Sequence, residues 1–225
     1  MVRVKICGIT RLEDARLAIE LGADALGFNF YEKSPRCIAP ADAWNIVRKL
    51  PALVSTVGVF VNWDSGAVIA LAKSLQLSAV QLHGDESASI TGKCAKHFPV
   101  IKAFRAGSKF PLTQLRSHGS ASAFLLDAAP APRESQAYGG TGRAADWNIA
   151  RRAAAEYPIL LAGGLTPENV TEAILAVRPY AVDVASGVES SPGVKDPAKL
   201  RAFFCEVARS NRELLAGRKD NGPSS

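Results

Sequence analysis

Residues 3–10 read RVKICGIT, and an amphipathic stretch over 12–21 follows them. A short run rich in Val and Ile predicts a buried strand, and a glycine directly after it indicates a turn. Cys7 therefore stands at the carboxyl end of the strand, which is where the catalytic groups of a closed parallel barrel project. This strand and the helix after it form the first unit of the predicted fold.

Seven more strand–helix units follow along the chain. The predicted strands are 3–7, 25–29, 56–61, 79–83, 100–104, 123–127, 159–162 and 181–185, and the predicted helices are 12–21, 40–50, 65–75, 86–96, 112–116, 146–156, 167–177 and 197–209. Proline suits a first helical position after Thr166 and after Asp196. Eight such units predict an α/β fold, a single (β/α)8 TIM barrel with eight parallel strands and outer helices, with a doubly wound open sheet as the alternative.

The composition is that of an ordinary globular protein, with 225 residues of which 48% are hydrophobic and 21% charged. We expect one catalytic barrel domain over 1–212 and a polar, disordered tail over 213–225. The apolar runs are strand-sized, so we expect neither a membrane span nor a signal peptide. These features predict a cytoplasmic protein that does not bind membranes.

The charges and cysteines narrow the function further. The net charge of +6 reflects either a solvated surface or a positive field that attracts an anionic substrate. Lys and Arg are dispersed, which argues against nucleic-acid binding. The four cysteines lack the spacing of metal ligands, and the chain has no dinucleotide fingerprint. We therefore expect free thiols, no metal and no cofactor.

Cys7 is the first candidate catalytic residue. Side chains alternate along a strand, so Lys5 and Cys7 point together into the barrel, while Val4 and Ile6 face the helices. A nearby ammonium group favours thiolate over thiol, so Cys7 is predicted to act as a base at neutral pH. The alternative is an inert buried cysteine.

Polar residues at other strand ends should face the same mouth. Asp127 follows three bulky apolar residues, whose desolvating effect is expected to raise its carboxyl pKa and make it a proton donor, unless it serves as a cap or in a salt bridge. Gln81, His83 and Asp183 are candidates for substrate contact, although His83 could instead donate to a loop carbonyl. Arg36 follows the second strand, where its guanidinium suits a carboxylate.

Glycine-rich turns follow the last three strands. Glycine lets backbone N–H groups approach an anion closely, and barrels commonly bind phosphate at the loops after strands seven and eight. The predicted phosphate-binding residues are Gly142, Gly163, Gly164, Ser186 and Gly187.

These features together resemble the phosphoribosylanthranilate isomerase family of tryptophan biosynthesis, over about residues 5–197. The matching blocks are KICGIT (5–10), SPR (34–36), VGVFVN (57–62), QLHG (81–84), LD (126–127), GGTG (139–142), LAGGL (161–165) and VDVASGVE (182–189), with PG (192–193) and KD (195–196). Departures are small. Ala185 stands where the family usually has Ser, and Ile38 follows Cys37, where the family more often has an aromatic residue before the aliphatic one. The loop over 130–136 is idiosyncratic.

The resemblance implies an intramolecular aldose–ketose isomerisation, the Amadori rearrangement of N-(5-phosphoribosyl)anthranilate. It implies Asp127 as general acid, Cys7 as general base, Arg36 at the anthranilate carboxylate and Asp183 at substrate hydroxyls. The partner would be this small anionic substrate, with the protein a monomer or a homodimer. The rival hypotheses are a metal-dependent epimerase, an indole-forming synthase and a non-catalytic binder of phosphate ligands.

Overall fold

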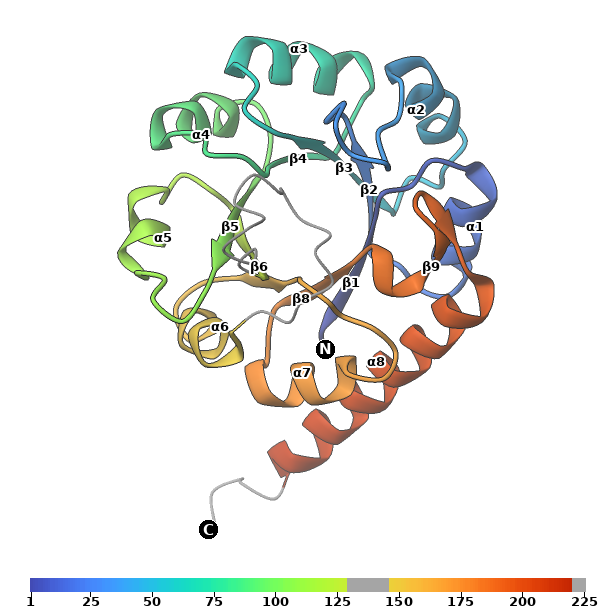
Figure 1. Ribbon diagram of the computed structural model, residues 1–225, viewed down its shortest axis with the longest axis vertical. Helices are drawn as coiled ribbons and strands as arrows, with labels where there is room; N and C mark the ends of the chain where they lie inside the picture. The colour runs from blue at the N-terminus through green and yellow to red at the C-terminus, as the bar shows by residue number, and fades with distance from the viewer. Residues whose placement is uncertain (129–145, 220–225) are drawn as a thin grey trace.

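The computed structural model describes residues 1–128 and 146–219 (Figure 1). Eight parallel strands pair in chain order and close into a barrel, because β8 pairs with β1. The strands are β1 (Arg3–Cys7), β2 (Ala25–Asn29), β3 (Ser55–Phe60), β4 (Ala79–Leu82), β5 (Val100–Ala106), β6 (Ala123–Ala128), β7 (Ile159–Leu161) and β8 (Ala181–Val184). This closure confirms the predicted barrel and excludes the open sheet.

The helices form a ring around the barrel (Figure 1). They are α1 (Leu12–Glu20), α2 (Pro40–Val47), α3 (Ser65–Ser74), α4 (Ala88–Ala95), α5 (Thr113–Ser117), α6 (Trp147–Ala154), α7 (Val170–Val177) and α8 (Pro197–Lys219). Helix α8 packs against α7 and α1 and so joins the last unit to the first. None of the helices in the described residues is long and apolar enough to cross a membrane.

Two apolar layers hold this architecture together. Val4, Ile6 and Phe28 belong to the large core between the strands and the helices. Leu125 and Leu160 belong to a smaller cluster inside the barrel, together with four alanines. Alternation along each strand produces this division, since neighbouring side chains leave the sheet on opposite faces.

Two helices were predicted to begin at a proline, and only one of them does. Helix α8 begins at Pro197, and the Asp196 carboxylate caps it by accepting hydrogen bonds from two backbone N–H groups, at 2.8 and 3.0 Å. Helix α7 begins only at Val170, so the predicted start at Pro167 was wrong. There the Asn169 side chain accepts from Thr166 N–H and donates to the Gly164 carbonyl, which stabilises a turn instead.

Helix α8 extends through 213–219, where the sequence predicted the beginning of a polar tail. Leu214 still packs against the core there, and Glu213 lies 3.6 Å from Arg209 one turn earlier. Polar composition alone does not end a helix that keeps one apolar contact. Residues 220–225 lie outside the described residues.

A short turn and a hairpin that follow β8 were not predicted. A 3-10 turn, η1 (Ser186–Val188), leads into an antiparallel hairpin of β9 (Glu189–Ser191) and β10 (Val194–Lys195). Its strands are too short to produce a recognisable pattern in the sequence.

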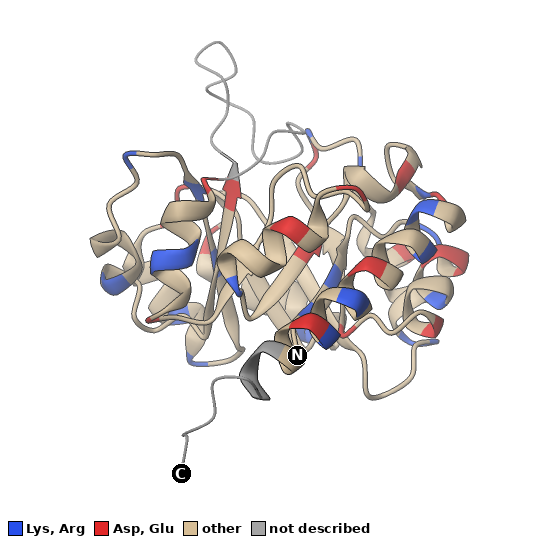
Figure 2. Ribbon diagram, turned by 90° about the horizontal axis from the view of Figure 1, so that it is seen from below, with Lys and Arg blue, Asp and Glu red and all other residues tan. Residues whose placement is uncertain are grey.

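The surface charges are mixed. Figure 2 shows Lys and Arg interspersed with Asp and Glu along the helices in view.

Candidate active site

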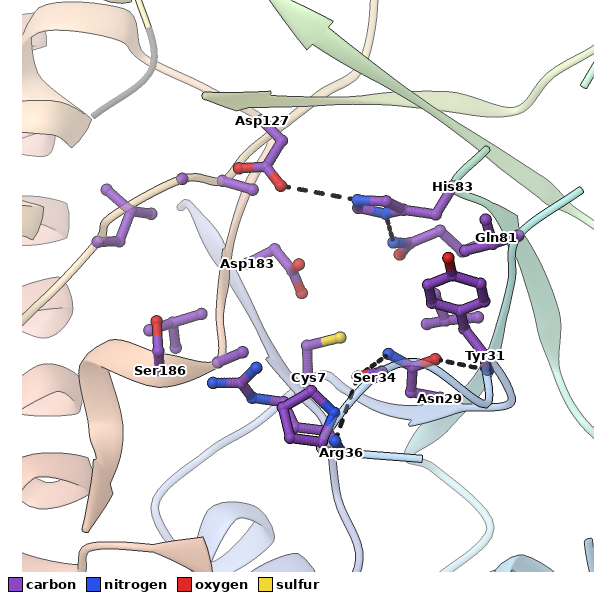
Figure 3. Close-up of a pocket in the computed structure, with 18 of the residues that line it drawn as sticks. Cys7, Asn29, Tyr31, Ser34, Arg36, Gln81, His83, Asp127, Asp183 and Ser186 are labelled. Atoms are coloured by element: carbon purple, nitrogen blue, oxygen red, sulfur yellow. Dashed lines mark hydrogen bonds and ion pairs between the residues drawn. The ribbon is translucent and has the colours of Figure 1, made fainter. Parts of the chain in front are cut away.

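A cavity of about 290 Å³ opens at the carboxyl ends of the strands. Six different strands contribute to its walls (Figure 3). The lining residues include Cys7, Asn29, Tyr31, Ser34, Arg36, Val59, Val61, Gln81, His83, Asp127, Gly163, Gly164, Asp183 and Ser186. All the predicted catalytic and substrate-contacting residues therefore share one pocket, because parallel strands end at the same rim.

Cys7 lies beside a buried ion pair at the end of β1. The Nζ of Lys5 is 2.6 Å from Oδ1 of Asp183 on the neighbouring strand β8. Gly27 on β2 leaves the space for this arrangement, since a Cβ there would lie 3.0 Å from both Cys7 Sγ and Lys5 Nζ. The thiol and the ammonium group are therefore close neighbours inside the barrel.

Lys5 favours the thiolate of Cys7, as predicted, but the net shift of the Cys7 pKa is upward. Burial raises the pKa of the Cys7 thiol, and the opposing effects of Lys5 and Lys195 do not outweigh burial and the nearby Asp183 carboxylate. Burial tends to lower the pKa of Lys5, but the Asp183 carboxylate and Cys7 together outweigh burial, and the pKa is raised. The positive charge of Lys5 is thus engaged by Asp183, and the balance of effects at Cys7 favours the thiol over the thiolate.

Gln81, His83 and Asp127 form a row across the pocket (Figure 3). The amide nitrogen of Gln81 is 2.7 Å from His83 Nδ1, and His83 Nε2 is 3.6 Å from Asp127 Oδ2. The donor in the contact between Gln81 and His83 depends on the tautomer of the ring. His83 thus contacts a side chain on each edge of its ring, rather than the loop carbonyl considered above.

Arg36 enters the pocket from the loop after β2. Asn29 and Ser34 shape this loop: Asn29 Nδ2 donates to Ser34 Oγ at 3.1 Å, and Asn29 Oδ1 accepts from Tyr31 N–H at 2.9 Å. The Arg36 guanidinium makes an ion pair with Glu189 of β9, with Nη2 2.7 Å from Oε2. Burial opposes the ionisation of Glu189, but Arg36 and Lys195 hold the pKa of its carboxyl below the usual value.

The loops after β7 and β8 form the glycine-rich wall. Gly163 and Gly164 adopt positive φ angles of 85° and 62°, which favour glycine, and both line the pocket with Ser186. Gly187 does not line the pocket. A Cβ on Gly187 would lie 1.8 Å from the Leu165 carbonyl oxygen, so its observed role is the close contact of the two loops. Gly142, the remaining predicted phosphate residue, lies outside the described residues.

Sequence reasoning missed several residues of this site. Asn29 could have been found by the strand-end rule that found Gln81 and Asp183. Tyr31 carried no signal, because a tyrosine in a loop is common. Glu189 and Lys195 lie on the unpredicted hairpin. Within the described part of the chain, no three His, Cys, Asp or Glu side chains gather as a metal site would require.

The closed barrel and the pocket at its carboxyl-end mouth, with a thiol, carboxylates and an arginine, define a (β/α)8-barrel enzyme. The family model described as N-(5'-phosphoribosyl)anthranilate (PRA) isomerase matches residues 4–206. The isomerase of Geobacter sulfurreducens is 51% identical over 204 residues, covering 91% of this chain and 97% of the relative. The chain belongs to this family, the isomerases of tryptophan biosynthesis.

Solved structures agree with this assignment. Phosphoribosyl anthranilate isomerase from Thermotoga maritima superposes with a TM-score of 0.85 at 43% identity, covering 93% of this chain and all of the other. A second isomerase structure, solved in complex with reduced 1-(o-carboxyphenylamino)-1-deoxyribulose 5-phosphate, has a TM-score of 0.82 at 41% identity, covering 93% of this chain and all of the other.

Proposed function

We propose that the protein catalyses the Amadori rearrangement of N-(5-phosphoribosyl)anthranilate to 1-(2-carboxyphenylamino)-1-deoxyribulose 5-phosphate, with Asp127 as general acid and Cys7 as general base. The observation that carries this proposal is the pocket itself. One ligand-sized cavity is lined by a carboxyl from β6, a thiol from β1, an arginine and two glycine-rich loops. Family membership supports the same reaction.

The first step opens the ribose ring. Asp127 donates its proton to the ring oxygen, the C1–O bond breaks, and the nitrogen lone pair forms a C1=N bond. The product of this step is a positively charged Schiff base with a new hydroxyl group on the sugar. His83 Nε2, at 3.6 Å from the Asp127 carboxyl, helps to orient the acid toward its substrate.

The second step removes the proton on C2. The Cys7 thiolate accepts it, the electron pair of the C–H bond forms C1=C2, and the C1=N electrons return to nitrogen. The resulting enolamine then tautomerises: the C2 hydroxyl loses its proton and C1 gains one, which leaves the ketone. Substrate and product are isomers, so no oxidant or reductant is needed.

The raised pKa of Cys7 makes this order of steps important. In the ligand-free protein the thiolate is a minor species, because burial disfavours it. Ring opening creates a positive charge on the substrate close to the thiol, and it leaves Asp127 as a carboxylate. The thiol proton returns to this carboxylate, so the thiolate forms beside the charged Schiff base. The acid step therefore prepares the base step. A thiol with a raised pKa is also a stronger base in each molecule that does ionise.

The remaining lining residues are proposed to hold the substrate. Arg36 would receive the anthranilate carboxylate, and Gln81, His83 and Asp183 would contact the sugar. Tyr31, Val59 and Val61 line the same cavity and suit the aromatic ring. The phosphate would bind at the loops after β7 and β8, through Gly163, Gly164 and Ser186.

The direct test is turnover of freshly prepared phosphoribosylanthranilate by the purified protein, followed by the loss of its anthranilate-type fluorescence. We expect the wild type to remove this signal, with or without a chelator, and Cys7→Ser to lose most of the activity. No turnover by the folded wild type would refute the reaction. Turnover abolished by the chelator would favour the metal-dependent rival, and binding without turnover would favour the non-catalytic one.

A further inference from the structure

A buried carboxylate that the proposed mechanism does not use lies against the guanidinium of Arg36. Glu189 on β9 accepts from Arg36 Nε at 3.0 and 3.1 Å, through both of its oxygens, and from Nη2 at 2.7 Å. These residues are 153 positions apart in the chain. The hairpin after β8 thus reaches the loop after β2 and fixes one edge of the guanidinium.

Lys195 on β10 approaches the same carboxylate. Its Nζ is 2.8 Å from Glu189 Oε1 and also donates to the backbone carbonyls of Cys7, at 2.6 Å, and Ala185, at 3.3 Å. The Gly193 N–H contacts the same Oε1 at 3.4 Å. Glu189 is therefore fastened to the ends of β1 and β8, the rigid part of the barrel, rather than to a loop alone.

The aliphatic part of Arg36 is also held. A Cβ at Gly8 would lie 2.6 Å from Arg36 Cδ, so the arginine packs directly on the backbone after β1. The Arg36 N–H donates to Ser34 Oγ at 3.2 Å. Both ends of the side chain are thus fixed by contacts, and few rotamers of Arg36 remain available.

The charges of this cluster do not cancel. Arg36 and Lys195 carry two positive charges and share the one carboxylate of Glu189. The Asp14 carboxylate, which accepts from the Lys195 backbone N–H at 3.0 Å, lies 4.0 Å from Arg11, and Asp183 is engaged by Lys5. The Lys195 side chain is 0% exposed and Glu189 is 4% exposed, whereas Arg36 is 14% exposed and lines the cavity. The excess positive charge therefore meets the pocket at Arg36, where one anionic group of a ligand would neutralise it.

We propose that Glu189, seated by Lys195, is a positioning residue that selects the edge of Arg36 that receives the substrate carboxylate. This proposal deepens the proposed function and depends on it. Glu189 occupies Nε and one side of Nη2, while Nη1 makes no hydrogen bond with any residue in the described part of the chain. The substrate carboxylate is then bound by the Nη1–Nη2 end of the guanidinium. In this way Glu189 makes the site selective for ligands that carry a carboxylate at that position.

The test compares two ligands that differ only in this carboxylate. The first is reduced 1-(o-carboxyphenylamino)-1-deoxyribulose 5-phosphate, and the second is the same compound with an unsubstituted phenyl ring. Dissociation constants are measured by calorimetry for the wild type, Glu189→Gln, Arg36→Met and the double variant. Glu189→Gln keeps the side-chain shape but removes the charge that orients Arg36.

We expect Glu189→Gln to weaken the carboxylated ligand about tenfold, roughly the effect of losing one well-placed charge-assisted hydrogen bond. Binding of the phenyl ligand should stay within about twofold of the wild type, since it makes no use of the positioned edge. Because Glu189 acts through Arg36, the double variant should bind the carboxylated ligand no more weakly than Arg36→Met.

Equal losses for both ligands would assign Glu189 a merely structural role, and tighter binding of the carboxylated ligand would mean that Glu189 competes for Arg36. Either result overturns the proposal. If Arg36→Met retains full preference for the carboxylated ligand, the carboxylate binds elsewhere, and both this proposal and the role of Arg36 fail while turnover by the wild type still supports the reaction.

Glu189→Asp provides a second variant should Glu189→Gln fail to fold. It keeps the negative charge for Lys195 but withdraws the carboxylate from Arg36 by about one methylene group. The same selective loss for the carboxylated ligand is expected, and an unchanged ratio of the two dissociation constants contradicts the proposal. Circular dichroism of each variant checks that the barrel is intact.

Discussion

Replacing Asp183 with Asn should make the thiol of Cys7 more reactive, even though Asp183 is a proposed substrate contact. Asp183 raises the pKa of Cys7 in two ways: its negative charge repels the thiolate, and it engages the Lys5 ammonium at 2.6 Å. Asparagine keeps the shape of the side chain and removes the charge. Lys5 is then left with the Cys7 sulfur as its nearest ionisable partner.

The size of the effect follows from the geometry. Cys7 Sγ and Lys5 Nζ both lie 3.0 Å from the position of a Cβ on Gly27, so they are at most about 6 Å apart. The carboxylate oxygen is a further 2.6 Å from Nζ and hence within about 9 Å of the sulfur. Two unit charges at that distance repel by about 2 kcal/mol at an effective dielectric constant of about 20, which is a factor of about 20 in thiolate population.

The assay is the rate at which iodoacetamide alkylates Cys7, measured between about pH 6 and pH 10. Thiols ionise within this range. Cys37 and Cys205 are exposed and are replaced by Ser in every sample, whereas Cys94 is buried and stays. At neutral pH the rate is proportional to the thiolate fraction, and we expect an increase of about tenfold or more for Asp183→Asn.

A matched control is Asp42→Asn, which removes the same charge from the exposed surface of α2 and should leave the rate unchanged. An unchanged or slower reaction of Asp183→Asn would refute the reasoning. It would mean that Lys5, deprived of its carboxylate, loses its own proton instead of stabilising the sulfur anion.

Three other predictions concern the same pocket. Asp127→Asn should lower kcat by about 10²–10⁴-fold, while the affinity for the reduced product analogue changes little, because the variant keeps the shape and loses the acid. Steady-state kinetics measure kcat and calorimetry measures the affinity. Near-wild-type turnover would show that Asp127 is not the acid. The kcat/KM of the wild type should rise with pH above neutrality, since burial raises the pKa of Cys7 and the base works only as thiolate; a profile that is flat across the alkaline range would argue against Cys7. Gly187→Ala should destabilise the fold by about 1–3 kcal/mol, because its Cβ would overlap the Leu165 carbonyl oxygen at 1.8 Å; thermal unfolding measures this, and an unchanged Tm would show that the loops after β7 and β8 can separate freely.

The barrel architecture could be predicted from the sequence, and so could several of the polar residues that line the pocket. Short apolar runs alternating with amphipathic stretches recur eight times, and parallel strands can close only with all their carboxyl ends at one rim. Cys7, Gln81, His83, Asp127 and Asp183 were found because each is a polar residue at or near the end of such a run. Strand-end position is a local property, so local sequence was sufficient.

Helix boundaries were less certain, because side-chain contacts decide them. Asp196 caps the helix that begins at Pro197, as its sequence suggests, whereas Asn169 diverts the chain after Pro167 into a turn. The extension of α8 depends on the contact of Leu214 with the core. These competing bonds are invisible to a rule that considers only the residue before a proline.

Only the tertiary structure decided the state of the chemical groups. Lys5 and Asp183 are 178 residues apart, and closure of the barrel makes them neighbours. Lys5 still lowers the pKa of the Cys7 thiol, but burial and the Asp183 carboxylate outweigh it. Glu189 meets Arg36 through a hairpin whose short strands were not predicted. A pKa, or the free edge of a guanidinium, is the sum of burial and of every charge nearby in space, and the chain order fixes neither until the fold brings those groups together.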